Sequence, residues 1–337
     1  MRAWTVKDPG PIDTHPIQLV EREAPEPGPR QVLVKVLTCG VCRTDLHLAE
    51  GDLVPKRRGV IPGHEVIGIV EAMGSSSARF SLGDRIGIAW LRRTCGICYY
   101  CKSGSENLCI SPLFTGWDED GGFAEYAVVD EDYAYPIPDE FSDETAAPLL
   151  CSGIIGYRAL RRSALPDGGR LGIYGFGASA HLSIQIALHQ GARVHVVTRS
   201  EDARKLALQM GASSAVDVGE YPPEPLDSAI LFAPVGSLVP QIMEALDRGG
   251  TLAIAGIHLS DIPSLSYDRH VFLEKNLRSV TANTRKDGTE FLELAARIPI
   301  KVTTVVYPFE QADKALTDLA HDRFTGAAVL TMRPTAQ

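Results

Sequence analysis

The sequence predicts an α/β protein with two domains, one rich in β-strands and one built on a doubly wound parallel sheet. The chain has 337 residues, which is long for a single hydrophobic core. Up to about residue 150 it carries short apolar or alternating runs that end at Gly or Pro, as strands do. From about residue 153, apolar strands alternate with helices, and this alternation indicates parallel strands joined by right-handed crossovers.

The N-terminal region is predicted to be β-rich and irregular. Its clearest strands are the runs 32–40, 66–74 and 84–90, and no long helical period precedes residue 46. These runs predict a sheet with short connections rather than a helical bundle.

The second region begins with a strand over 170–176 and a helix that ends at Gly191. A strand over 193–199 and a helix that ends at Gly211 follow, each helix closed by a glycine that cannot easily continue it. The alternation continues to the end of the chain through these segments: 215–218, 228–234, 238–246, 251–257, 277–283, 289–298, 301–309, 310–322 and 327–332.

Composition excludes several classes of protein. The net charge of −9 argues against a nucleic-acid partner, which would need a clustered basic face. No apolar run reaches the roughly 18–20 residues that a membrane span needs. The N-terminus (MRAWTVKDPG) lacks the apolar core of a signal peptide, so we expect a cytoplasmic protein that does not contact membranes.

A glycine-rich turn follows the strand over 170–176 and opens a helix. Its first glycine permits a tight turn, its second lets the backbone approach a pyrophosphate, and the small third position allows close helix packing. The helix N-terminus offers free N–H groups to the anion. This strand–turn–helix context predicts dinucleotide binding by Gly175, Phe176, Gly177, Ala178, Ser179 and Ala180.

The end of the next strand bears on the choice of cofactor. An acidic residue there would bind the ribose hydroxyls of NAD, but this strand ends in Thr198, Arg199 and Ser200, with no carboxylate before Glu201. Arg199 and the two hydroxyls could receive a 2′-phosphate, which favours NADP(H). The alternative is a solvated Arg199 and a site that takes NAD without the acid.

Four of the seven cysteines fall within the segment CGICYYCKSGSENLC. Four thiolates at this spacing can close a tetrahedral structural zinc site, and the alternative is an iron–sulfur cluster. An odd number of cysteines without an export signal argues against a disulfide framework. We therefore predict a structural zinc ion held by Cys95, Cys98, Cys101 and Cys109.

A second set of candidate ligands is dispersed along the chain. Cys42, His64 and Cys151 would supply two thiolates and an imidazole, which leaves a fourth position open as a catalytic zinc requires. Spacing alone does not link these residues, and a lone His or Cys is more often a core or surface residue.

The motifs together resemble the zinc-dependent medium-chain alcohol dehydrogenases, in particular the shorter microbial members and their aldehyde-reducing relatives. The resemblance covers nearly the whole chain, in the family's order, through these segments: CGVCRTDLH, PGHE, GDRIGIAW, the four-cysteine loop, GGFAEY, PLLCSGIIGY and GFGASA. It implies a GroES-like catalytic domain (1–152 with 284–337) and an inserted Rossmann domain that binds the cofactor (153–283).

The resemblance also implies roles at the catalytic zinc. Cys42, His64 and Cys151 match its three ligands, and Glu65 matches an acidic neighbour that approaches the metal during ligand exchange. Asp45 matches a carboxylate that orients the ligand histidine, although a helix-capping aspartate is an alternative.

Further matches concern the proton, the cofactor and the substrate. Thr44 and His47 match a proton relay, and Arg43 matches a residue that contacts the pyrophosphate. The implied reaction is reversible hydride transfer between a primary alcohol, aliphatic or aromatic, and the nicotinamide, with zinc polarising the substrate oxygen. The remaining implied contacts are Ala255 and Ile257 for the cofactor, and Trp90, Leu91 and Trp117 for the substrate.

Some positions depart from the family pattern, and some alternatives stay open. The family often has Thr at Ile155, a small apolar residue at Ser179 and Arg at Ala327, so these departures concern cofactor affinity and geometry and leave the chemistry unchanged. A zinc-free reductase would not need the three dispersed ligands, and a non-catalytic protein of the same fold would be expected to lose them. By analogy with relatives we expect a homotetramer or homodimer.

Overall fold

A computed structural model describes residues 1–333 of the chain. They form two compact units, which we call the first and the second unit. The first comprises Met1–Cys151, Ala282–Arg297 and the chain from Val302 onward, and the second comprises Ser152–Thr281 and Ile298–Lys301. The chain therefore leaves the first unit, builds the second and returns.

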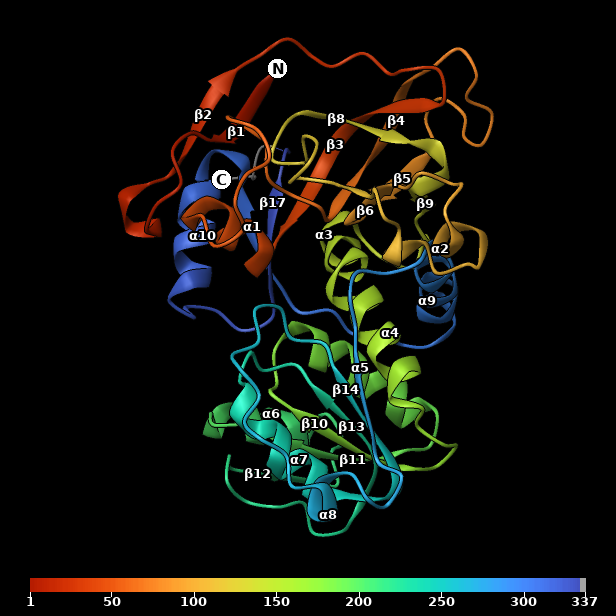
Figure 1. Cartoon of the computed structure of the whole chain (residues 1–337). Coiled ribbons are helices and arrows are strands. Elements are labelled where there is room, and N and C mark those ends of the chain that lie inside the picture. The colour runs from red at the N-terminus through yellow and green to blue at the C-terminus, as the bar shows by residue number, and fades with distance from the viewer. Residues whose placement is uncertain (334–337) are drawn as a thin grey trace. The chain divides into compact units, whose positions relative to one another are not determined.

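The core of the first unit is a seven-stranded sheet in the order β16-β17-β3-β4-β5-β9, with β8 also paired to β3. Its strands are β3 (Gln31–Val41), β4 (Val66–Met73), β5 (Arg85–Ile88), β8 (Tyr126–Asp130), β9 (Ala134–Pro136), β16 (Thr304–Pro308) and β17 (Ala327–Thr331). The C-terminal strand β17 lies antiparallel to β3, with Leu330 opposite Cys39 (Figure 1). The C-terminal strands β16 and β17 thus extend the sheet that contains β3.

Shorter elements surround this sheet. Two two-stranded sheets pair β1 (Arg2–Val6) with β2 (Ile17–Glu21) and β6 (Leu91–Arg93) with β7 (Leu113–Phe114). The helices of the first unit are α1 (Arg43–Glu50), α2 (Tyr99–Lys102), α3 (Asp143–Ala146), α9 (Arg285–Arg297) and α10 (Ala312–Ala320). The structure confirms the β-rich first region of the sequence analysis.

The second unit contains a six-stranded parallel sheet in the order β12-β11-β10-β13-β14-β15. Its strands are β10 (Arg170–Tyr174), β11 (Arg193–Val197), β12 (Ser214–Val216), β13 (Leu226–Leu231), β14 (Leu246–Ile254) and β15 (Asn276–Ser279). Successive strands are added on one side of β10 as far as β12, and on its other side from β13 onward. Open α/β sheets bind ligands at the point where the direction of addition changes. The predicted doubly wound sheet is confirmed.

In the second unit α4 (Ser152–Ser163) precedes the first strand, and these helices lie between successive strands: α5 (Ala178–His189), α6 (Glu201–Gln209), α7 (Val239–Ala245) and α8 (Tyr267–His270). Leu171, Ile173, Ala229 and Ile230 are fully buried in the middle of the sheet. Strands buried on both faces read as continuous apolar runs, which is the pattern that predicted them.

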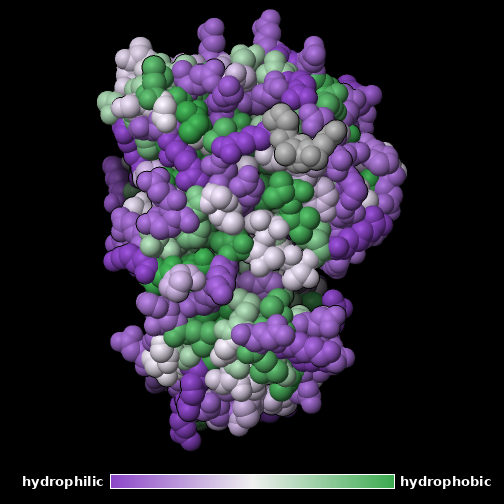
Figure 2. Space-filling model, turned by 180° about the vertical axis from the view of Figure 1, so that it is seen from behind, coloured by the Kyte–Doolittle hydropathy of each residue, from purple (hydrophilic) through white to green (hydrophobic). Residues whose placement is uncertain are grey.

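Hydrophilic side chains cover most of the face in Figure 2, and hydrophobic ones form patches between them. Among residues 1–333, no helix is long and apolar enough to cross a membrane.

Candidate active site and zinc-binding groups

The four cysteines of the segment 95–109 gather in the loop between β6 and β7. Their sulfur atoms all lie within 4.8 Å of one another. The short helix α2 carries Cys101, and Cys98 stands immediately before it. Backbone N–H groups of Cys98 and Ser111 donate to the sulfur atoms of Cys95 and Cys109, at 3.4 Å and 3.3 Å. Four soft donors at this separation fit a tetrahedral zinc ion.

Backbone N–H groups favour the thiolate form of Cys95 and Cys98, whereas burial raises the pKa of Cys109 to about 11. The N–H groups of Cys101 and Ile110 lower the pKa of Cys98 to about 6. The pKa of Cys95 is lowered by the N–H groups of Ile97 and Cys98. Hydrogen bonds to a thiolate favour the charged form, and the thiolate is the form that binds metals.

The dispersed candidate ligands meet in a second group within the first unit. One ligand atom from each of Cys42, His64, Glu65 and Cys151 lies within 4.8 Å of the others. Cys42 follows β3, His64 and Glu65 precede β4, and Cys151 follows a short 3₁₀ turn over Ala147–Leu150. Because Cys39 pairs with Val66 across β3 and β4, the sheet brings these segments together.

The three zinc-ligand candidates of this group point at one another. Nε2 of His64 lies 3.4 Å from Sγ of Cys151, and the two sulfur atoms of Cys42 and Cys151 are 3.8 Å apart. Contact with Cys151 lowers the pKa of Cys42 well below its usual value, and the same contact raises the pKa of Cys151. Two soft sulfurs and an imidazole nitrogen fit a three-ligand zinc site.

Asp45 holds the local structure around His64. Its Oδ2 accepts the backbone N–H of Cys42 at 2.9 Å, and its Oδ1 accepts the N–H of Gly63 at 2.9 Å. The same Oδ1 lies 3.4 Å from Nδ1 of His64. Asp45 therefore caps α1 and also lies beside the imidazole, which is compatible with the predicted role of orienting His64.

Glu65 is buried, and burial raises the pKa of its carboxyl well above the usual value. Space for this side chain depends on Gly40, because a Cβ at residue 40 would lie 1.9 Å from Oε2 of Glu65. Gly40 is not among the residues predicted from the sequence. The motif CGVC contains it, but its role depends on the close approach of β3 to Glu65.

The two predicted relay residues lie on α1. Thr44 is buried, and its Oγ1 lies 3.8 Å from Sγ of Cys42. Nδ1 of His47 lies 3.0 Å from Oδ2 of Asp52. Residues three apart share one face of a helix, so the hydroxyl beside the cysteine and the imidazole lie on the same side of α1.

Three aromatic rings, which we call the aromatic cluster, adjoin His64. The ring of Trp90 meets the imidazole edge-on at 5.0 Å. The rings of Trp90, Phe114 and Trp117 are nearly parallel, with centroids 4.9–6.1 Å apart. Sequence reasoning missed Phe114, which β7 contributes. Leu91, in contrast, is buried in the hydrophobic core.

The glycine-rich turn of the second unit connects β10 to α5. Gly175 has φ 87°, a left-handed conformation, and a Cβ there would meet the backbone N of Ala233 at 2.8 Å. Gly177 stands immediately before α5, and nothing lies within 4 Å of the position of its Cβ. Phe176 belongs to the turn, and Ala178, Ser179 and Ala180 form the first turn of the helix. The two glycines thus meet the two requirements of a phosphate-binding turn, which are a tight backbone turn and room for the phosphate to approach the backbone.

The other predicted cofactor residues follow the neighbouring strands. Thr198, Arg199 and Ser200 follow β11, and Oγ of Ser200 caps α6 by accepting the N–H of Ala203 at 3.2 Å. Arg204, which sequence reasoning missed, donates from Nη1 to the carbonyl oxygens of Thr198 and Arg199 at 2.8 Å each. Ala255 and Ile257 follow β14. All these positions follow the carboxyl ends of parallel strands, where such sheets bind ligands.

Arg43 in the first unit makes an ion pair. Its Nη2 lies 2.5 Å from Oδ1 of Asp322, after α10. Of the positions that depart from the family pattern, Ile155 lies in α4, Ser179 accepts the hydroxyl of Ser183 through its carbonyl, and Ala327 begins β17.

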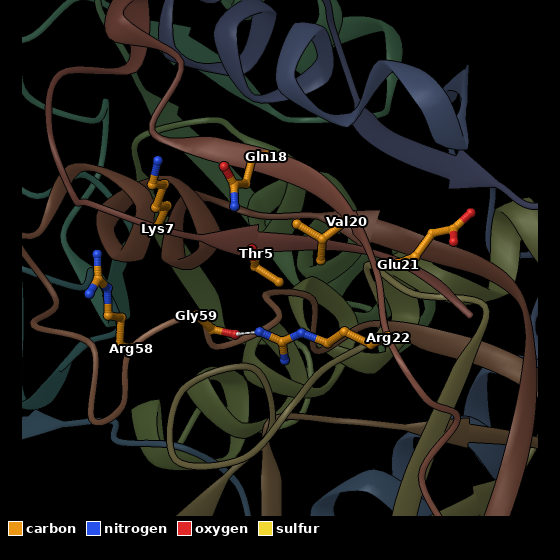
Figure 3. Close-up of a pocket in the computed structure, with 8 residues that line it drawn as sticks. All are labelled: Thr5, Lys7, Gln18, Val20, Glu21, Arg22, Arg58 and Gly59. Atoms are coloured by element: carbon orange, nitrogen blue, oxygen red, sulfur yellow. Dashed lines mark hydrogen bonds between the residues drawn. The ribbon is translucent and has the colours of Figure 1, made fainter.

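A shallow pocket of about 400 Å³ lies beside the β1–β2 hairpin (Figure 3). The guanidinium of Arg22 donates to the carbonyl oxygen of Gly59 at 2.6 Å within it. It shares no residue with either cysteine-containing group, so we assign no step of a reaction to it. Its lining residues are Thr5, Lys7, Gln18, Val20, Glu21, Arg22, Arg58 and Gly59.

Comparison with known proteins assigns the chain to a family. Residues 28–139 match the alcohol dehydrogenase GroES-like domain, and residues 180–297 match the zinc-binding dehydrogenase family. A Mycobacterium tuberculosis protein named "Probable alcohol dehydrogenase AdhA" is 58% identical over 98% of this chain and 97% of its own. The chain belongs to the zinc-containing medium-chain alcohol dehydrogenases.

Two further relatives support this assignment. An alcohol dehydrogenase of Geobacillus stearothermophilus is 34% identical over 94% of this chain and 96% of its own. A CAD from Helicobacter pylori, in a crystal structure complexed with NADP(H), superposes with a TM-score of 0.87 at 26% identity, covering 98% of this chain and 99% of that chain. The chain is a zinc-dependent alcohol dehydrogenase that uses a nicotinamide cofactor, and it carries two zinc-binding groups.

Proposed function

We propose that Cys42, His64 and Cys151 hold the catalytic zinc, and that Cys95, Cys98, Cys101 and Cys109 hold the structural one. The observation that carries the proposal is the convergence of two thiols and an imidazole from three separate segments within 4.8 Å. Glu65 adjoins this group and takes part in ligand exchange, and Asp45 orients the imidazole of His64. Zinc bound there supplies a Lewis acid that polarises the substrate oxygen.

We infer that the chain's own residues move the proton. The Thr44 hydroxyl, buried beside Cys42, exchanges a proton with the substrate oxygen, and His47 passes it to solvent. Asp52 holds the imidazole of His47 through Nδ1. The reaction converts a primary alcohol and the oxidised nicotinamide to an aldehyde, the reduced nicotinamide and a proton.

For the substrate, we propose primary alcohols and aldehydes with an aliphatic or aromatic body. Trp90 offers apolar ring surface next to His64, and Trp117, nearly parallel to Trp90, extends that surface away from the catalytic group. Flat apolar surface favours substrates of the same kind. Leu91 is buried in the hydrophobic core, and its predicted contact with the substrate stays a prediction.

For the cofactor, we propose a preference for NADP(H). No carboxylate stands among Thr198, Arg199 and Ser200, and Glu201 pairs with Lys205 at 2.8 Å. The 2′-phosphate would meet the exposed Arg199 guanidinium and the Thr198 hydroxyl. Arg204 fixes the backbone of this segment. The pyrophosphate would bind at the turn Gly175–Ala180 of the second unit, and Ala255 and Ile257 stay predicted cofactor contacts of the same unit. The predicted role of Arg43 at the pyrophosphate also stays a prediction.

The division into a catalytic domain (1–152 with 284–337) and a cofactor-binding domain (153–283) stays a prediction, as do the homotetramer or homodimer and the cytoplasmic location. The units of the structure divide between Cys151 and Ser152 and between Thr281 and Ala282.

One experiment tests the proposal. The purified protein is assayed for benzaldehyde reduction with NADPH and with NADH, and Arg199→Ala is assayed beside it. We expect a higher kcat/KM with NADPH, by about tenfold, because a charge-assisted hydrogen bond contributes about 1.5 kcal/mol or more when well formed. A preference for NADH, unchanged in Arg199→Ala, would refute the cofactor proposal, and no turnover with either would refute the substrate proposal.

A further inference from the structure

A lysine stands at the outer end of the aromatic cluster. Nζ of Lys56 lies 4.6 Å from the centroid of the Trp117 ring, a cation–π contact. The assigned activity gives this residue no role.

The loop that carries Lys56 is attached to the cluster. Nε1 of Trp117 donates to the carbonyl oxygen of Val54 at 2.9 Å, two residues before the lysine. This hydrogen bond and the cation–π contact both hold the loop over 54–59 against the same ring. The side chain of Lys56 is exposed, so its ammonium remains accessible to solvent and to a ligand.

The charge of Lys56 is not neutralised locally, unlike that of its neighbours. Arg57 pairs with Asp120 at 2.5 Å, and Arg58 lies 3.6 Å from a carboxylate oxygen of Asp8. Among residues 1–333, no carboxylate oxygen lies within 4.0 Å of Nζ of Lys56, the largest separation of an ion pair. The loop therefore presents one uncompensated positive charge, at the aromatic ring.

The cluster links this charge to the catalytic group. Trp90 contacts His64, Trp117 lies nearly parallel to Trp90, and Lys56 contacts Trp117. A substrate that lies along these rings with its reacting oxygen beside the catalytic group would direct its remote end toward the ammonium. With a net charge of −9 the protein repels anions in general, so a local positive charge is what an anionic substrate would need.

We propose that Lys56 is a specificity-determining residue, which favours aromatic alcohols and aldehydes that carry a carboxylate at the end remote from the reacting oxygen. This inference rests on the proposed role of Trp90 and Trp117 in substrate binding. The reaction itself is unchanged: the aldehyde carbon takes a hydride from the nicotinamide, its oxygen takes a proton, and the carboxylate stays ionised throughout.

The test compares charged and neutral substrates in the holoenzyme. The kcat/KM for 4-carboxybenzaldehyde and for the longer 4-carboxycinnamaldehyde is divided by that for the corresponding methyl ester. In Lys56→Gln we expect this ratio to fall about threefold to fivefold for at least one of the two lengths, the range for an exposed charge contact. In Lys56→Glu it should fall further, because attraction becomes repulsion. The loss should lie in KM, with kcat unchanged, since the contact is the same in the ground and transition states.

Arg58→Gln is the matched control. It removes one positive charge two residues away in the same loop, from a side chain that pairs with Asp8 instead of contacting the cluster. We expect Arg58→Gln to leave the ratio unchanged. The wild-type ratio should also fall toward one as salt rises from low concentration, because an exposed contact is screened.

Binding without turnover gives an independent readout. The affinity of 4-carbamoylbenzoate relative to benzamide, measured by calorimetry, should drop by the same factor in Lys56→Gln. If Lys56→Gln and Arg58→Gln change the ratios equally, or not at all, the inference is wrong and Lys56 only covers Trp117. If the wild type reduces neither the esters nor benzaldehyde, the proposed substrate class fails instead, and the two failures are thereby distinguished.

Discussion

The two cysteine-containing groups of the first unit differ in how the fold assembles them. The four-cysteine group draws all its ligands from one loop of fifteen residues, and three of its four cysteines are partly exposed. The catalytic group draws on segments around residues 42, 64 and 151, and His64 and Glu65 are almost completely buried. The first group orders the loop that carries it, whereas the residues of the second group are held in place by the surrounding sheet.

This difference explains their chemistry. Four sulfur donors fill a tetrahedral metal and leave no position for a substrate. Two sulfurs and one imidazole leave a position open, and a buried carboxyl, a buried hydroxyl and an aromatic ring surround it. Loss of a ligand should therefore reduce stability at the first group and activity at the second.

The largest effect is expected from Cys151→Ser. Replacing this thiolate weakens the catalytic metal, so kcat/KM should drop at least about a hundredfold. The melting temperature should change little, because β3 and β4 position Cys42 and His64 without the metal. Steady-state kinetics and thermal unfolding of the same preparation check both statements. Substantial activity in a folded Cys151→Ser protein would remove Cys151 from the ligand set.

Thr44→Val should come next. The valine keeps the volume but cannot carry a proton, so we expect a loss of about a hundredfold in kcat, in the range of general acid–base catalysis. His47→Gln should cost much less, because water can replace an imidazole that is partly exposed. Comparison of kcat and its pH profile for the two variants tests the order. An unchanged pH profile in His47→Gln would count against the relay.

Cys98→Ser should act on stability instead. The closed group orders the loop between β6 and β7, and a structural zinc contributes folding free energy directly. A loss of about 2 kcal/mol would lower the melting temperature by several degrees in a domain of this size. Activity at low temperature should persist. If thermal unfolding is unchanged, the assignment of a structural role is wrong.

A pair of glycine variants compares the two groups without removing a ligand, and the smallest effect of all is expected from Gly96→Ala. A Cβ at residue 40 would lie 1.9 Å from Glu65, whereas nothing lies within 4 Å of a Cβ at residue 96 in the four-cysteine loop. Gly40→Ala should cost about 1–3 kcal/mol and reduce activity by displacing Glu65. Gly96→Ala meets only the strain of its φ of +71°, about 1 kcal/mol, and should leave kcat unchanged. Chemical denaturation and kinetics would separate them, and equal effects on kcat would contradict the comparison.

The contrast between the groups also shows how far sequence reasoning reaches. The cysteines at 95, 98, 101 and 109 are predictable because their spacing alone brings them together. The alternating strands and helices of the second unit follow from periodicity, and its parallel order was confirmed. Cys42, His64 and Cys151 could be linked only through the resemblance to a family, because no local spacing encodes a contact between distant segments.

The roles of several other residues near the catalytic group could not be predicted from the sequence, for the same reason. Gly40 matters because β3 passes close to Glu65, and Phe114 because β7 lays its ring against Trp90. Lys56 matters because its loop folds onto Trp117. Each role depends on a tertiary contact, and the residue type alone is compatible with an ordinary core or surface position.

The most direct test of the account is the zinc content per chain of three proteins: the wild type, Cys151→Ser and Cys98→Ser, measured by atomic emission after gel filtration. We predict two zinc ions in the wild type and about one in each variant, with Cys98→Ser still active at low temperature and Cys151→Ser inactive but stable. One zinc ion in the wild type, or the loss of both ions from either folded variant, would contradict two separate groups with different roles.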